Sequence, residues 1–364
     1  MRNGGAKRFN TIVGNPNDAA GLHAAMRRFI EYRGMMGGTE SSLYSLERYI
    51  RDFISWADAR SVTHPQHVTH SVLERYQRAL YYYRKKDGAP LSVASQRAKL
   101  VPLRSFFKWL TRSGELSANP ASEIELPRRI RRLPGFVLTA EEAERVMSLA
   151  DTSTPVGLRD RAMMEVLYST GIRRMELGRL AVGDIDHDRA VMLIRMGKGG
   201  KDRLIPIGTR ALHWVQQYLD RARVQLAWNA MESTLFLSNF GGPLNACWLS
   251  TTVAQYVERA QLGKHGGCHL FRHTMATLML EGGADIRFIQ AMLGHAEIST
   301  TQIYTQVAVR QLQQVHAMTH PGAQLRARGV LEAPADTEPQ ADDENAAEAL
   351  LAALEAEADE DEVP

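Results

Sequence analysis

The chain has 364 residues, 44% of them hydrophobic, which is enough to bury one large core or two moderate ones. Its two cysteines exclude a disulfide framework, and no apolar run reaches the roughly 18 residues of a membrane helix. The net charge of +3 hides an asymmetry, because residues 331–364 hold 13 Asp and Glu and no Lys or Arg. Without that tail the chain has 44 Lys and Arg against 28 Asp and Glu, a net charge of about +16. The strong positive charge of residues 1–330 indicates a polyanionic binding partner such as nucleic acid. The alternative is that this charge serves only to keep the protein soluble.

The N-terminal third is predicted to be helical. Residues 1–20 are rich in Gly and Asn without apolar periodicity, which predicts a flexible arm, and they lack the apolar stretch of a signal peptide. We therefore expect a cytoplasmic protein. Helical patterns over a predicted domain at 21–117 lie near residues 21–34, 40–60, 70–85 and 92–113.

The last of these patterns carries a basic stripe. Arg97, Arg104, Lys108 and Arg112 lie 7, 4 and 4 residues apart, so a helix gathers them on one face. Pro102 inside the pattern predicts a kink or a break. The stripe fits a solvated face and a DNA contact equally well, and it makes Arg97, Arg104 and Lys108 candidate DNA contacts.

A basic linker is predicted at 118–134. The stretch ANPASEIELPRRIRRLP holds three prolines and four arginines with little periodicity, which indicates a domain boundary. Such a linker can follow a phosphate backbone while it joins two lobes. Its candidate DNA contacts are Arg128, Arg129, Arg131 and Arg132.

A second domain is expected over 135–322, mainly α with a small antiparallel β-sheet. Thr139 and Glu142 have the spacing of a capping box, and RAVMLIRM and RLIPI read as two strands around a glycine-rich hairpin tip. The composition of residues 323–364 predicts an acidic, disordered tail, although AAEALLAALEAEADEDE has residues suited to a short helix. The predicted helices lie near 140–150, 158–169, 174–180, 209–228, 250–261, 271–281, 286–292 and 300–316.

Two basic stretches of this domain suit phosphate. In STGIRRMEL (169–177), Gly171 should end one helix and place Arg173 at the start of the next, where backbone N–H groups and a guanidinium attract anions. The alternative is a surface arginine paired with Glu176. In MGKGGKDR (196–203), Lys198 sits at the hairpin tip, and Asp202 after Lys201 breaks the phosphate-loop pattern of nucleotide hydrolases.

Histidines and a tyrosine mark two further stretches. In CHLFRHTMAT (268–277), His269 and Arg272 share a helix face, whereas His273 points elsewhere and is expected to be structural. Adjacent Cys268 and His269 cannot easily share a tetrahedral site, so we expect no metal and no cofactor. In LGHAEISTTQIYT (293–305), glycine ends a helix before His295. A second capping box, Ser299 with Gln302, then places Tyr304 in the second turn of a new helix, where the residues alone favour a core tyrosine.

Taken together, these stretches resemble the active site of the tyrosine recombinases, a family that includes phage integrases, integron integrases and Xer-type resolvases. The family patterns TGxRxxEL, GKGxKxR, HxxRH and LGHxxxxTTxxYT are met, in order, by Thr170–Leu177, Gly197–Arg203, His269–His273 and Leu293–Thr305. The resemblance covers about 40–320 and is strongest to the Xer-like branch, where a segment similar to QLQQVHAMTHPGA follows the tyrosine. Cys268, in place of a small residue, and the acidic tail depart from the family pattern.

The resemblance implies a fold and a mechanism. It implies a helical N-terminal core-binding (SAM-like) domain followed by the family's catalytic domain, acting on double-stranded DNA with paired inverted half-sites in the bacterial cytoplasm. It implies a homotetramer on DNA, or a heterotetramer with a related recombinase, with 306–318 docking on an adjacent protomer. The implied catalytic set is Arg173, Lys198, His269, Arg272, His295 and the nucleophile Tyr304, with Glu176 in support and Lys201 and Arg203 as further DNA contacts. The alternatives are a type IB topoisomerase and a non-catalytic DNA-binding regulator.

Overall fold

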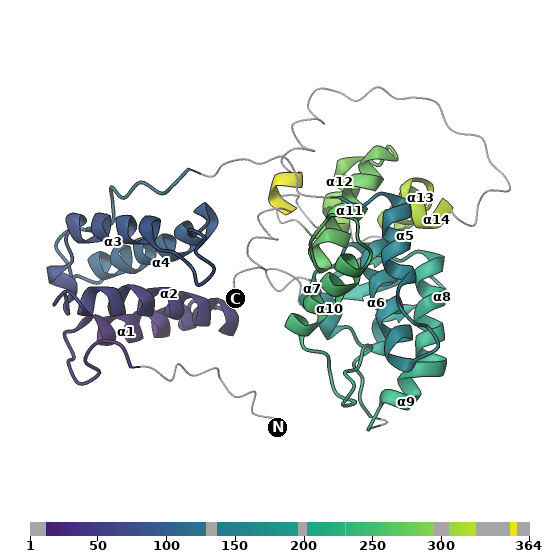
Figure 1. Cartoon of the computed structure of the whole chain (residues 1–364), viewed down its shortest axis with the longest axis horizontal. Coiled ribbons are helices and arrows are strands. Elements are labelled where there is room, and N and C mark those ends of the chain that lie inside the picture. The colour runs from purple at the N-terminus through teal and green to yellow at the C-terminus, as the bar shows by residue number, and fades with distance from the viewer. Residues whose placement is uncertain are drawn as a thin grey trace. The chain divides into compact units, whose positions relative to one another are not determined.

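The structure is a computed structural model that describes residues 12–128, 137–195, 202–229, 231–294, 306–324 and 350–354. The chain divides into two compact units, residues 1–131 and residues 132–362 (Figure 1). The predicted arm at 1–20 falls mostly outside the described residues, as do Arg129, Arg131 and Arg132 of the predicted linker.

The first unit is built from four helices: α1 (Leu22–Met35), α2 (Glu40–Asp58), α3 (His70–Tyr82) and α4 (Val93–Arg112). Thr39, Thr69 and Ser92 cap the last three, each accepting a backbone N–H three residues on. These boundaries agree with the helical patterns within a few residues.

Aromatic side chains fill the core of this unit. Phe29, Phe53, Phe106 and Phe107 are each at most 1% exposed, and Phe53 meets Phe107 edge to face at 6.0 Å. The sequence predicts a kink or a break at Pro102; the helix does not break there, because α4 runs through it. The helix buries Leu100, Leu103, Phe106 and Phe107 across that point, so packing holds the turn despite the missing N–H.

The second unit holds a three-stranded antiparallel sheet in the order β1 (Ile185–Asp186), β2 (Val191–Ile194), β3 (Arg203–Pro206). Met192 pairs with Ile205 and Ile194 pairs with Arg203. The two predicted strands are therefore confirmed, and β1 is an additional short strand that pairs with β2.

Helices make up the rest of the described second unit. α6 (Pro155–Thr170) lies at its centre, where α8 (Thr209–Tyr218) and α11 (Cys268–Glu281) pack against it. Every residue of α6 from Gly157 onward is buried. The others are α5 (Ala140–Ser148), α7 (Arg174–Arg179), α9 (Val224–Leu226), α10 (Ala246–Arg259), α12 (Ile286–Leu293), α13 (Gln306–Thr319) and α14 (Pro321–Gln324), with short turns η2 (Val182–Asp184) and η3 (Leu219–Arg223). The short turn η1 (Pro65–His67) belongs to the first unit.

Local signals in the sequence set several of these boundaries. The capping box of α5 is present, since Thr139 and Glu142 each accept the other's backbone N–H. The helix expected over 209–228 is divided into α8, the π-helical turn η3 and α9. None of the described helices is both long enough and apolar enough to cross a membrane.

Two buried histidines tie α13 to the centre of this unit. The Nε2 of His316 donates to the carbonyl of Ser169 and that of His320 to the carbonyl of Tyr168, both at 2.8 Å. The two rings stack at 4.7 Å. These contacts bind the C-terminal part of the segment 306–324 to the last turn of α6, so in the single chain α13 packs on its own unit.

Candidate active site

Gly171 places Arg173 at the start of α7. Gly171 has the left-handed φ of 60°, and a Cβ there would lie 2.2 Å from Cε of Met275, so glycine ends α6 at this point. The Arg173 backbone N–H donates to Oε2 of Glu176 at 3.0 Å, and its Nη1 donates to Oε1 at 3.3 Å. The pairing that the sequence left as an alternative is therefore present, while the Arg173 side chain stays 17% exposed.

Glu176 is held more tightly by Arg203. Nη1 and Nη2 of Arg203 donate to Oε1 and Oε2 of Glu176, both at 2.8 Å, in a parallel fork. Burial by itself would raise the pKa of Glu176, but the hydrogen bonds and charge of Arg203, with the Arg173 N–H, lower that pKa to about 2. The carboxylate is thus ionised at neutral pH and hydrogen-bonded to Arg173.

The surroundings of Arg203 differ from those of an exposed DNA contact. The side chain is 7% exposed, and its Nε donates to the carbonyl of Met292 at 3.1 Å. With its fork on Glu176 and its Nε on α12, the guanidinium faces the interior, which does not fit a DNA contact.

Arg272 is enclosed by two helix ends. It lies on α11 at 4% exposure, and its Nη1 donates to the carbonyl of Gly171 at 2.6 Å, while Nη2 donates to the carbonyl of Leu293 at 3.0 Å. Both carbonyls belong to C-terminal turns, where the helix dipole places partial negative charge that favours a cation. The guanidinium is therefore fixed to the carbonyl of Gly171, which lies two residues before Arg173 in the chain, and to the end of α12.

Gly294 closes α12 above these arginines. Its φ of 68° is left-handed, and a Cβ there would lie 3.0 Å from Cζ of Arg203. The glycine stop predicted before His295 is confirmed. His295, Tyr304 and the predicted second capping box fall within 295–305, outside the described residues.

The two histidines of α11 differ as expected in their surroundings. His269 is half-buried beside Gly266, where a Cβ would lie 3.2 Å from its Nε2. His273 is 6% exposed and sits inside the unit. Across the described ranges, no three His, Cys, Asp or Glu side chains form a group able to hold a metal ion.

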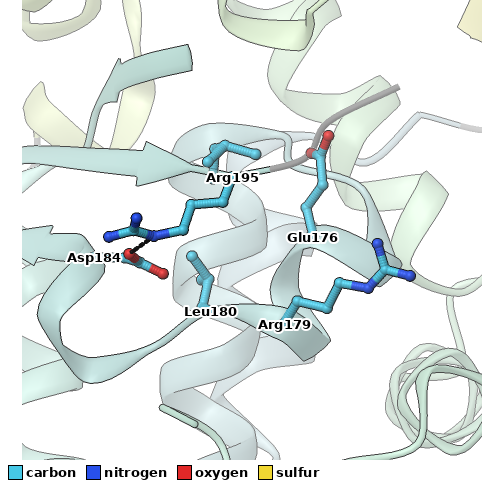
Figure 2. Close-up of a pocket in the computed structure, with 6 residues that line it drawn as sticks. Glu176, Arg179, Leu180, Asp184 and Arg195 are labelled. Atoms are coloured by element: carbon cyan, nitrogen blue, oxygen red, sulfur yellow. Dashed lines mark hydrogen bonds and ion pairs between the residues drawn. The ribbon is translucent and has the colours of Figure 1, made fainter. Parts of the chain in front are cut away.

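An ion pair that the sequence reasoning missed lies at the base of the β2–β3 hairpin. Arg195 Nε donates to Oδ1 of Asp184 at 2.6 Å, and Oδ2 of Asp184 accepts the N–H of Ala181 at 2.9 Å. Figure 2 shows this pair on one side of a cavity of about 430 Å³, with Arg179 and Glu176 on the other. Lys198 and Lys201 belong to 196–201, which the structure does not describe. The pair nevertheless fixes the strand that leads into the hairpin tip.

The candidate DNA contacts of the first unit divide into two groups. Arg97 is half-buried and its Nη1 donates to the carbonyl of Pro127 at 2.7 Å, so it holds the middle of the predicted linker. Arg104 and Lys108 are exposed and line a hollow of about 290 Å³ with residues 119–126. Arg128 is exposed as well.

Motifs far apart in sequence therefore meet in one place. Arg173, Glu176, Arg203 and Arg272 are joined directly or through the carbonyls of Gly171, Met292 and Leu293. Arginines held around a site by buried partners suit the oxygens of a phosphate, because guanidinium remains charged and matches that geometry.

The comparisons with known proteins agree with this chemistry. Residues 137–311 match the model of the phage integrase family. The chain is 49% identical over 286 residues to tyrosine recombinase XerC 2 of Ralstonia nicotianae, covering 79% of this chain and 82% of that one. It is 40% identical to tyrosine recombinase XerC of Pelobacter propionicus, covering 78% and 90%. The chain belongs to the phage integrase family and is a tyrosine-type, Xer-like site-specific DNA recombinase.

Solved structures share the fold. The XerH site-specific recombinase bound to its difH substrate superposes with a TM-score of 0.60 at 19% identity, covering 82% of this chain and 98% of that one. A λ integrase tetramer bound to a Holliday junction gives 0.58 at 20% identity, covering 78% and 80%. The predicted fold class, mainly helical with a small antiparallel sheet, is confirmed.

Proposed function

We propose that Tyr304 is the nucleophile of this recombinase. Its phenolic oxygen attacks the scissile phosphorus, the bond from phosphorus to the 5′-oxygen breaks, and a 3′-phosphotyrosyl link with a free 5′-hydroxyl remains. The link preserves the energy of the phosphodiester, so the 5′-hydroxyl of a partner strand reverses the step without a cofactor. Support comes from the four motifs in family order and from the arginine network that α7, β3, α11 and α12 build.

Arg173 and Arg272 are proposed to bind the non-bridging oxygens of the scissile phosphate. Charge on those oxygens must be stabilised in the transition state, and preorganised donors do this without reorganisation. Arg272 is immobilised by the carbonyls of Gly171 and Leu293, while Arg173 rests on a carboxylate whose pKa is about 2. This buried support is the observation that carries the proposal.

Proton transfer is assigned to the remaining cationic side chains. Lys198 protonates the departing 5′-oxygen, His269 serves as acid, base or relay near Tyr304, and His295 donates a hydrogen bond to the phosphate. The ion pair of Arg195 with Asp184 supports the strand that leads to Lys198. Two arginines and a lysine then supply the positive charge that metal ions supply in nucleases.

Glu176 and Arg203 act as positioning residues in this proposal. Glu176 accepts hydrogen bonds from Arg173, and Arg203 joins Glu176 to the carbonyl of Met292 near the end of α12. Because His295 follows that helix end directly, the same pair supports both sides of the phosphate site.

The substrate is proposed to be double-stranded DNA with paired inverted half-sites. Strand exchange needs two duplexes, so four protomers assemble on the DNA. They form either a homotetramer or a heterotetramer with a related recombinase. Arg104, Lys108 and the arginines Arg128, Arg129, Arg131 and Arg132 contact the phosphate backbone, with Lys201 near the hairpin tip. The integrase and XerH structures are DNA complexes, and one is a tetramer on a Holliday junction.

A covalent-trapping experiment tests the nucleophile. The wild type should form a denaturant-resistant adduct on nicked DNA that carries its site, and Tyr304→Phe should bind the same DNA without forming one. Adducts formed by Tyr304→Phe would show that another residue is the nucleophile. Exchange between two differently labelled duplexes separates recombination from the relaxation activity of a type IB topoisomerase.

A further inference from the structure

The acidic C-terminal segment lies outside the part of the chain that its family accounts for. The family model ends at residue 311, and residues 331–364 carry 13 Asp and Glu without a Lys or Arg. The composition predicts disorder for this extension. The part of it that the structure describes, residues 350–354, is instead helical and half to fully buried apart from Ala352.

Two leucines anchor this segment to the catalytic unit. Leu350 is 2% exposed and Leu354 is 1% exposed, and their spacing of four places both on one helix face. Leu351 packs beside them, whereas Ala352 is exposed. Figure 1 shows the segment as a short yellow helix beside α11 and α12. Its apolar surroundings come from α11, α12 and α13 and include Met275, Ala276, Met279, Ile286, Ile289, Met292, Leu293 and Leu312.

This apolar cluster adjoins the arginine network of the site. Leu293 belongs to the same apolar cluster as Leu350 and Leu354, and its carbonyl accepts the Nη2 of Arg272. Met275 of the cluster lies one turn after Arg272 on α11. A segment seated here is therefore attached within a few residues of a proposed phosphate-binding group.

The sequence places strong negative charge next to the anchor. Six carboxylates follow Leu354, at Glu355, Glu357, Asp359, Glu360, Asp361 and Glu362. Since an extended chain spans at most about 3.5 Å per residue, none of them is farther than about 28 Å from Leu354. Anchoring thus maintains a high effective concentration of carboxylate beside a unit whose substrate is a polyanion.

We propose that residues 350–354 dock in cis on the apolar cluster formed by α11, α12 and α13 and hold the acidic extension where it competes with DNA phosphates. The extension is then a built-in restraint on DNA binding, and the segment docked on the cluster is this chain's own leucine segment. The proposal rests on DNA binding by the catalytic unit.

A matched pair of single substitutions in the full-length chain tests the anchor. Leu354→Glu and Ala352→Glu add the same charge two residues apart, but only the first breaks the buried contact. Both lie outside residues 137–311, which match the family model, and the melting temperatures of the two variants show whether the catalytic unit stays folded. Affinity for a duplex of arbitrary sequence, followed by fluorescence anisotropy at low salt, should be about three- to tenfold higher for Leu354→Glu than for Ala352→Glu. Equal affinities would overturn the proposal.

The charge is tested with the anchor unchanged. Replacing the six carboxylates of 355–362 by Asn and Gln should raise affinity for the same duplex, and the gain should shrink at high salt because screening shortens the range of the charges. No gain at low salt would show that the acidic residues do not compete with DNA. If the wild type and every variant fail to bind duplex DNA at all, the proposed function fails, not the role of the extension.

Hydrogen exchange separates docking in cis from exchange between copies. Amides of 350–354 should be protected in the wild type and not in Leu354→Glu, to the same degree across a hundredfold range of protein concentration. Protection that grows with concentration, together with a dimer in sedimentation, would identify a second copy as the occupant and overturn docking in cis.

Discussion

Arg203 and Glu176 face each other through two parallel hydrogen bonds of 2.8 Å, with both side chains less than a tenth exposed. Because the pair is buried, neither charge is stable without the other. Arg203 also reaches the carbonyl of Met292, so the pair connects α7, β3 and the end of α12. Arg203, which the resemblance places among the DNA contacts, thus holds Glu176, and Glu176 in turn holds Arg173, which we propose binds phosphate.

Removing Arg203 should therefore affect both stability and cleavage. Arg203→Ala leaves a buried carboxylate unpaired and should destabilise the catalytic unit by about 3–5 kcal/mol. Replacing both partners, with Glu176→Met and Arg203→Met, should restore much of the stability by removing both charges, while covalent cleavage stays impaired because Arg173 has lost its support. Chemical denaturation and adduct formation on a nicked duplex measure the two effects. A double variant that cleaves like the wild type would exclude the positioning role.

Gly171 offers a test of the hydrogen bonds that hold Arg272 to the carbonyls of Gly171 and Leu293. Gly171→Ala forces a side chain into a left-handed position and against Met275, which together should lower stability by about 2–4 kcal/mol. Moving the carbonyl that receives Arg272 should also slow adduct formation. The control is Gly183→Ala, where an added Cβ meets nothing within 4 Å. If Gly171→Ala had a lower melting temperature but cleaved DNA at the wild-type rate, the hydrogen bonds that hold Arg272 would not be needed for cleavage.

The stacked histidines predict acid sensitivity of α13. Burial lowers the pKa of His316, and burial together with the charges of His316 and Arg210 lowers that of His320 to about 3. Both pKa values lie below the unfolded value of 6.5, so the stabilisation is complete above pH 6.5 and is lost as the pH falls toward the folded pKa.

At pH 5 the loss from His320 alone should be about 2 kcal/mol. His320→Gln cannot titrate and can still donate to the carbonyl of Tyr168, so it should flatten the change in stability between pH 7 and pH 5. Melting temperatures of both proteins across this range provide the measurement. Parallel curves would assign the acid sensitivity to other groups.

Arg104 and Lys108 give a prediction for the first unit. If they contact phosphates, Arg104→Ala with Lys108→Ala should weaken binding to any duplex and reduce the dependence of log affinity on log salt by about 2. Arg75→Ala with Arg78→Ala on α3 removes two exposed charges elsewhere on the unit and controls for net charge. A double variant with the salt dependence of the wild type would remove these two residues from the interface.

Local signals in the sequence were enough to locate most elements. The cap at Thr139 marks a helix start, and the left-handed glycines at Gly171 and Gly294 mark helix ends, because each depends only on neighbouring backbone groups. The order of the four motifs was also sufficient for the family, which the relatives confirm. The proposed roles of Lys198, His295 and Tyr304 remain predictions, since those residues fall outside the described ranges.

Contacts between distant residues were decided by the tertiary structure. Arg203 is 27 positions from Glu176, and Arg272 is 101 positions from Gly171, so no spacing in the sequence indicates either partnership. The same holds for Leu350 and Leu354, whose acidic context predicts disorder until the apolar faces of α11, α12 and α13 provide a place to bury them. Composition and local pattern determine which segments form helices and which chemistry they carry. Burial determines which charges pair and which leucines dock, because its free energy depends on surfaces that exist only once the chain has folded.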